Sequence, residues 1–174
     1  SCRACLLLSL PLMPRPKSPP TQAAPLSATD YLKQVLTARV YDVAIESGLD
    51  PARTLGRRLH NKVFLKREDQ QPVFSFKLRG AYNKMAHLSD AERARGVICA
   101  SAGNHAQGVA TAAQLLGIRA TILMPKDSPV LKRERTAAAG AEVGLFDREK
   151  DDREAMARAI AEERGAIVVP PYDD

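Results

Sequence analysis

The stretch GVICASAGNHAQGVATAAQLLGIRATILMP, residues 96–125, decides the fold of this chain. It opens with an unbroken apolar run over 97–100, which is typical of a strand buried on both faces. A helical segment over 104–116 follows and ends at Gly117, the residue type that most often terminates a helix. A second apolar run over 119–124 then predicts another strand, which ends at a proline. This order indicates a parallel βαβ unit with a right-handed crossover.

The alternation continues after this unit. The sequence predicts a helix over 128–139, a strand over 142–146, a helix over 151–164 and a strand over 166–169. The strands are short apolar runs without polar alternation, as expected when helices cover both faces of a sheet. The predicted fold class is therefore α/β, a doubly wound parallel sheet with helices on both faces.

The segments before this unit have a less regular pattern of predicted helices and strands. Apolar residues recur at helical spacing over 27–43, with Ser27 or Thr29 as the cap. Gly48 and Pro51 indicate a loop, because both residue types interrupt regular structure. The remaining predicted elements are a short helix over 51–59, a strand over 63–65, a helix over 76–88 capped by Ser75, and a helix over 90–95 capped by Ser89.

Residues 1–26 differ from the rest of the chain, because they combine a leucine cluster with many prolines and no acidic residue. We expect a disordered leader, or sequence translated upstream of the true start. A targeting peptide is the alternative. The expected location is cytoplasmic, or organellar if residues 1–26 are a transit peptide. The domain prediction is this leader followed by one catalytic portion over 27–174.

The amino-acid composition limits the classes of partner and site that this chain can have. The 174 residues carry a formal net charge of +6, but no basic run is interleaved with aromatic residues, so no nucleic-acid partner is expected. The leucine run near the start is too short to span a membrane. Cys2 and Cys5 lack a second ligand pair for a zinc site, and Cys99 is interpreted as a small buried apolar residue.

A loop and a lysine are the candidates for ligand binding and catalysis. In doubly wound sheets, ligands bind outside the carboxyl ends of the strands. Residues 101–104 follow such a strand end and lead directly into a helix, whose free N–H groups favour an anion. Gly103 and Gly108 have the spacing of a P-loop, but the Lys-Ser/Thr pair is missing, so ATP binding is not expected. The pattern of a dinucleotide-binding loop is absent as well.

Lys77 lies at the start of a predicted helix. The positive helix end and the nearby Arg79 favour a neutral amine that can attack a carbonyl. A solvent-facing lysine is the alternative interpretation. His105 could be a general base, but packing is its preferred role.

Three segments carry a family resemblance. They resemble biosynthetic threonine dehydratases, in the fold-type II family of pyridoxal 5′-phosphate enzymes, and lie at residues 66–69, 72–81 and 101–108. The resemblance implies that Lys77 binds the cofactor covalently and moves the substrate's α-proton. It also implies that Phe76 lies against the pyridine ring and that Asn104 binds the phenolic oxygen. Ser101, Ala102, Gly103 and Asn104 would then bind the substrate.

The implied reaction is dehydration and deamination of L-threonine, or of L-serine, to a 2-oxo acid (2-oxobutanoate from threonine) and ammonia. The glycine-rich phosphate loop and regulatory domain of this family are not matched, so residues 27–174 are expected to be the N-terminal portion of a catalytic domain whose full-length form is a homo-oligomer. The alternatives are a non-catalytic remnant or binding module, and a relative of serine/threonine dehydratases or serine racemase.

Overall fold

A computed structural model describes residues 26–172, which fall in two units divided between Leu36 and Thr37. The described part of the first unit carries most of α1 (Ala28–Thr37). The Ser27 hydroxyl accepts the Asp30 N–H at 3.2 Å, and the Asp30 carboxylate accepts the Ser27 N–H at 3.0 Å. This pair confirms Ser27 as the cap. The helical spacing predicted to continue to residue 43 becomes a separate turn, η1 (Val40–Asp42).

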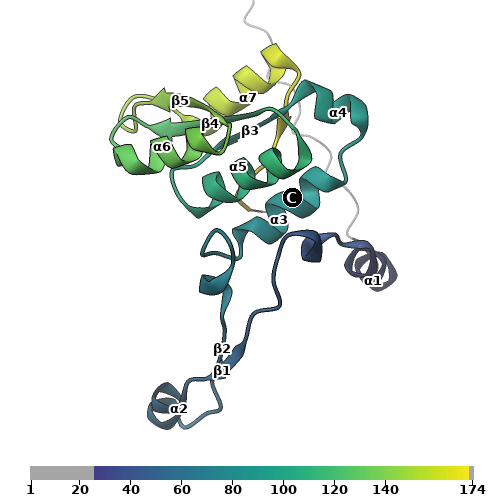
Figure 1. The fold of residues 1–174 in the computed structure, drawn as a ribbon, viewed down its shortest axis with the longest axis vertical. Coiled ribbons are helices and arrows are strands. Elements are labelled where there is room, and N and C mark those ends of the chain that lie inside the picture. The colour runs from purple at the N-terminus through teal and green to yellow at the C-terminus, as the bar shows by residue number, and fades with distance from the viewer. Residues whose placement is uncertain (1–25, 173–174) are drawn as a thin grey trace, which may run out of the picture. The chain divides into compact units, whose positions relative to one another are not determined.

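A four-stranded parallel sheet is the centre of the second unit, with strand order β5-β4-β3-β6 (Figure 1). The strands are β3 (Val97–Ala100), β4 (Ala120–Pro125), β5 (Glu142–Phe146) and β6 (Ile167–Val168). Val97 pairs with Ala120 on one side and with Ile167 on the other. The strand order therefore reverses at β3, and the carboxyl ends of β3 and β6 lie side by side.

Helices cover both faces of this sheet, as the sequence predicts. Val97 and Cys99 of β3 pack with α3 (Lys77–Ala86) and α5 (Asn104–Leu116) on one face, whereas Ile98 packs with α7 (Arg153–Arg164) on the other. Because successive residues of a strand point to opposite faces, one apolar run supplies both cores. The doubly wound prediction is confirmed. The remaining helices of this region are α4 (Asp90–Arg95) and α6 (Val130–Ala138).

The region before α3 departs from the prediction. Residues expected to form a loop near Pro51 form β1 (Leu49–Pro51), which pairs antiparallel with β2 (Phe64–Lys66) in a separate two-stranded sheet. The physical reason is long-range pairing, since Pro51 lies opposite Phe64 and needs no N–H at a sheet edge. The predicted short helix is present as α2 (Arg53–Leu59), which begins two residues later than predicted and connects the two strands. We call β1, α2 and β2 the arm.

Helices α2, α3, α6 and α7 begin one or two residues after the predicted starts, whereas α4 and α5 begin where predicted. Ser89 caps α4 in a capping box with Glu92, as predicted. Asp152 caps α7 by accepting the N–H groups of Glu154 and Ala155. The helix predicted from Ser128 begins at Val130, because Pro129 occupies the cap position. These shifts leave the loops at the carboxyl ends of the strands in place.

Candidate active site

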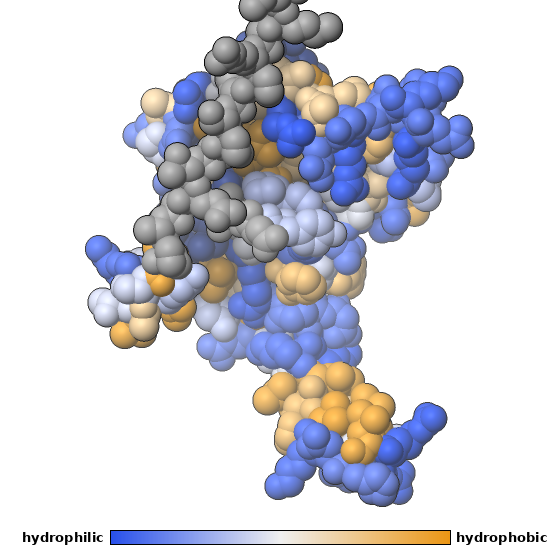
Figure 2. Space-filling model, turned by 180° about the vertical axis from the view of Figure 1, so that it is seen from behind, coloured by the Kyte–Doolittle hydropathy of each residue, from blue (hydrophilic) through white to orange (hydrophobic). Residues whose placement is uncertain are grey.

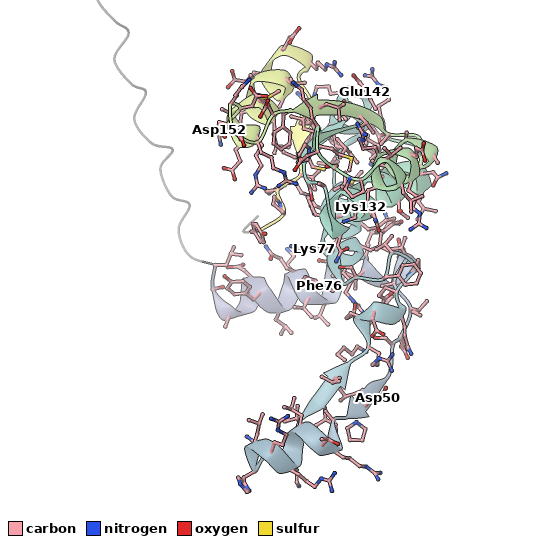
Figure 3. The ribbon with its side chains drawn as sticks, turned by 90° about the vertical axis from the view of Figure 1, so that its left-hand side faces the viewer. Asp50, Phe76, Lys77, Lys132, Glu142 and Asp152 are labelled. Atoms are coloured by element: carbon pink, nitrogen blue, oxygen red, sulfur yellow. The ribbon has the colours of Figure 1, made fainter. Side chains whose placement is uncertain are left out.

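Lys77 is the first residue of α3, one position after the start that the sequence predicts (Figure 3). Phe76 holds the cap position, and the Lys77 N–H donates to the Ser75 hydroxyl at 3.3 Å. Ser75 therefore supplies the expected side-chain acceptor, although it lies one residue before the cap position. Phe76 is 59% exposed and Lys77 is half-buried, so both side chains can meet a ligand.

Lys77 lines a cavity of about 220 Å³ between the start of α3 and the segment that follows β6. Its Nζ donates to the Pro171 carbonyl at 2.5 Å. The ring centroids of Tyr172 and Phe76 lie 4.5 Å and 5.4 Å from Nζ. The amine is thus in an aromatic pocket rather than in open solvent. The cavity is lined by Phe76, Lys77, Gly80, Ala81, Lys84, His105 and Val169 to Tyr172.

Gly108 of α5 sets the close approach of α5 to the lysine backbone. A Cβ built on Gly108 would lie 3.2 Å from the Lys77 carbonyl carbon and oxygen and 3.2 Å from the Leu78 nitrogen. Such contacts are tighter than ordinary van der Waals packing, so only glycine fits without a shift of one helix. The α3–α5 packing therefore fixes the Lys77 backbone relative to the sheet.

Arg79 is already paired within the protein. Its Nε lies 2.8 Å from the Glu68 carboxylate, and its guanidinium carbon lies 5.2 Å from the Tyr41 ring centroid. The Arg79 guanidinium, together with a hydrogen bond from Ser47, lowers the pKa of Glu68 to about 2. The negative charge of Glu68 therefore offsets the positive charge of Arg79.

The loop from Ser101 to Asn104 connects β3 to α5. Its Ser101 hydroxyl accepts the Gly103 N–H at 3.3 Å, and no side chain caps α5 at Gly103. Residues 101–103 are half-buried and Asn104 is exposed. Among the described residues, the hydrogen bonds and ring contacts of Lys77 reach residues 75, 76, 171 and 172 rather than this loop.

The structure thus brings Phe76 and Lys77 together, while Ser101, Ala102, Gly103 and Asn104 form a second group at the carboxyl end of β3. His105, the residue after Asn104, links the two groups because it lines the lysine cavity. His105 is buried, its Nε2 lies 2.9 Å from the Val169 carbonyl, and burial lowers its pKa. These contacts agree with the packing role that the sequence analysis favours.

Pro171 and Tyr172 are site residues that the sequence analysis does not identify. Both follow β6, whose carboxyl end lies next to that of β3 at the reversal of strand order. Ligand sites of open α/β sheets lie at such reversals. The strand order, once known, would have drawn attention to this segment.

The remaining sequence predictions concern the cysteines, membrane spans and metal sites. Cys99 is buried in β3, and burial raises the pKa of its thiol to about 12, as expected for an inert apolar residue. Cys2, Cys5 and the predicted leader to residue 25 lie outside the described residues. Within residues 26–172, no helix is long and apolar enough to cross a membrane. No cluster of His, Cys, Asp and Glu in that range could hold a metal ion.

Several curated proteins that are similar to this chain are named as biosynthetic threonine dehydratases. The chain is 55% identical to the biosynthetic L-threonine dehydratase of Burkholderia multivorans over 152 residues, covering 86% of this chain and 30% of that protein. It is 51% identical to the chloroplastic biosynthetic threonine dehydratase of Arabidopsis thaliana, covering 84% of this chain and 25% of that protein. The chain thus spans less than a third of the length of these curated relatives.

Two solved structures of related enzymes are similar to this chain. The processed form of threonine deaminase isoform 2 from Solanum lycopersicum superposes with a TM-score of 0.77 at 49% identity, over 84% of this chain and 43% of that one. Maize serine racemase superposes with a TM-score of 0.71 at 32% identity, over 78% of this chain and 41% of that one. The family model of pyridoxal-phosphate dependent enzymes matches residues 45–174. This chain therefore belongs to the pyridoxal-phosphate dependent enzyme family.

Proposed function

We propose that this chain carries the cofactor-binding lysine of an L-threonine dehydratase, which forms 2-oxobutanoate and ammonia. The observation that carries the proposal is the Lys77 amine, which faces a cavity between two aromatic rings at the start of α3. An aldehyde cofactor with a flat ring requires a primary amine that can bond to its aldehyde carbon and an aromatic surface against which its ring can lie. The residues present therefore fit pyridoxal phosphate at its aldehyde end.

Each site residue has a role in this proposal. Lys77 would bind the aldehyde carbon and later take up the α-proton of the amino acid. Phe76 would lie against the pyridine ring, and the Asn104 amide would bind the phenolic oxygen. The loop Ser101, Ala102 and Gly103 would hold the amino-acid carboxylate, since the free N–H groups at the start of α5 favour an anion. When bound, the cofactor withdraws electrons from the α-carbon of the substrate.

The test is to mix the purified chain with pyridoxal phosphate, reduce with borohydride, and locate the adduct by peptide mass mapping. We expect one dominant adduct on the Lys77 peptide, and none there in Lys77→Arg. Lys84 lines the same cavity and lies on the same helix, so Lys84→Arg is the matched control and should keep the adduct. Equal labelling of many lysines, insensitive to Lys77→Arg, would refute the proposal.

The substrate is tested with the same reaction. L-Threonine competes with Lys77 for the aldehyde, so its addition before reduction should lower the Lys77 adduct, whereas L-alanine should lower it less. L-Serine is the second candidate substrate, because maize serine racemase shares this fold at 32% identity. A larger effect of L-serine than of L-threonine would favour that alternative.

A further inference from the structure

The Lys77 amine is held by the segment that follows β6. We propose that Tyr172 is a positioning residue for Lys77: its ring, with the Pro171 carbonyl, holds the amine at the cavity and slows its capture of an aldehyde. The proposal rests on the proposed function, because it concerns the step at which Lys77 meets the cofactor. Neither the sequence motifs nor the names of similar proteins assign a role to Tyr172.

The contacts around Nζ come from two segments of the chain, the start of α3 and the residues after β6. The Pro171 carbonyl accepts a hydrogen bond from the amine at 2.5 Å, and the Tyr172 ring centroid lies 4.5 Å away. The Phe76 ring, from the start of α3, lies 5.4 Å away. Both rings are within the distance at which an aromatic face attracts an ammonium group. The amine is therefore held between residues that are far apart in the sequence.

The segment that carries Tyr172 is itself fixed to the sheet and to α5. The Val169 N–H donates to the Ile98 carbonyl at 2.9 Å, and the Val169 carbonyl lies 2.9 Å from His105 Nε2. Pro170 and Pro171 then restrict the backbone between this anchor and Tyr172. The ring position thus follows from the sheet, although the Tyr172 side chain is 69% exposed and can swing away.

The contacts oppose the chemistry that Lys77 is proposed to perform. A nitrogen attacks an aldehyde with its lone pair, so the ammonium group must first lose a proton to water and, with it, the attraction of the two rings. The aldehyde oxygen then leaves as water. An exposed contact between a cation and a ring changes an equilibrium by roughly two- to fivefold. Removing the Tyr172 ring should therefore speed the capture of pyridoxal phosphate by Lys77 roughly two- to fivefold.

A spectroscopic test reports on the contact without any cofactor. The lysines are reductively methylated with ¹³C-formaldehyde, which keeps their charge, and the Lys77 signal is assigned as the one missing in Lys77→Arg. Two nearby rings should shift this signal upfield from those of the other lysines. The shift should shrink in Tyr172→Leu and persist in Tyr172→Phe, because phenylalanine keeps the ring. Phe64→Leu, at an exposed aromatic residue of the arm, is the matched control and should leave the signal unchanged.

The kinetic test uses pyridoxal phosphate, trapped at Lys77 with cyanoborohydride and measured by peptide mass over time. We expect faster trapping in Tyr172→Leu than in the parent chain and Tyr172→Phe. An unchanged Lys77 signal in Tyr172→Leu, or an unchanged trapping rate, would overturn the inference. A parent chain in which Lys77 is trapped no faster than other lysines would instead refute the proposed function, while the methyl signal would still decide whether the contact exists.

Discussion

The arm and the four-stranded sheet use similar apolar residues but bury them to different extents. Ile98 and Ile122, in central strands of the sheet, are fully buried, whereas Phe64 and Leu65 of β2 are 54% and 51% exposed. Figure 2 shows an apolar patch on the arm, bordered by hydrophilic surface. The exposed apolar residues of the arm are Leu49, Leu55, Leu59, Phe64 and Leu65. Apolar strand formers alone therefore do not make a core. A sheet also needs helices on its faces, and a two-stranded hairpin has neither the width nor the cover.

Truncating a core side chain of the sheet should have the largest effect on stability. Ile122→Ala removes a fully buried side chain of β4 that packs with α3 and α5. The expected loss is about 2–5 kcal/mol, from lost burial and from the cavity left behind. The measurement is the free energy of unfolding from urea titration, followed by far-UV circular dichroism.

Phe64→Ala is the matched change in the arm. Because half of the Phe64 side chain is exposed, its loss should cost less than about 1 kcal/mol. An equal cost for Ile122→Ala and Phe64→Ala would contradict the contrast between the two regions. It would mean that the arm has a core of its own.

Gly108→Ala tests the contact that fixes the lysine backbone. The added methyl group would lie 3.2 Å from the Lys77 carbonyl, so α5 or α3 must shift. We expect a loss of about 1–3 kcal/mol and weaker selective labelling of Lys77 by pyridoxal phosphate. The urea titration measures the loss of stability, and the borohydride mapping measures the labelling of Lys77.

Gly80→Ala is the control on the facing helix, since a Cβ there would meet nothing within 4 Å. Alanine favours a helix over glycine, so this change should stabilise the chain by about 0.5–1 kcal/mol. If Gly108→Ala behaved like Gly80→Ala, the close approach of α5 to Lys77 would not constrain the site.

The contrast between the regions also explains what the sequence could predict. The bounds of β3, α5 and β5 follow the sequence prediction, because each element has a strong local signal: a short, mostly apolar run, or a helix closed by glycine. β1 has no such signal, and its three residues become a strand only through pairing with β2. Local sequence therefore predicts the sheet better than the arm.

The same limit applies to the site. Phe76 and Lys77 are recognisable because they lie in one continuous motif at the start of a helix. Pro171 and Tyr172 are not, because the hydrogen bond from Lys77 to Pro171 spans 94 residues. That contact depends on the strand order β3-β6, which the alternation of strands and helices does not specify. Site residues contributed by distant segments can be identified only from the three-dimensional structure.

A partly buried ion pair at the junction of the arm and α3 should give a smaller, pH-dependent effect. Glu68 follows β2 and pairs with Arg79 of α3, and these two side chains are only 18% and 21% exposed. The pKa of Glu68 is lowered from its ordinary value to about 2, chiefly by the hydrogen bond with Arg79. A carboxyl group with a lowered pKa stabilises the fold above its unfolded pKa and loses this contribution as the pH falls.

We therefore expect the stability of the parent chain to fall between about pH 5 and pH 2 by roughly 1–2 kcal/mol more than that of Glu68→Gln. The measurement is urea unfolding across this pH range. Glu142→Gln is the control, because the Glu142 pair with Arg164 is solvent-exposed, with side chains 59% and 48% exposed. Its removal should change the pH profile by less than about 1 kcal/mol. Equal pH profiles for the parent chain and Glu68→Gln would mean that the junction is held by the apolar contacts of α3 rather than by its ion pair.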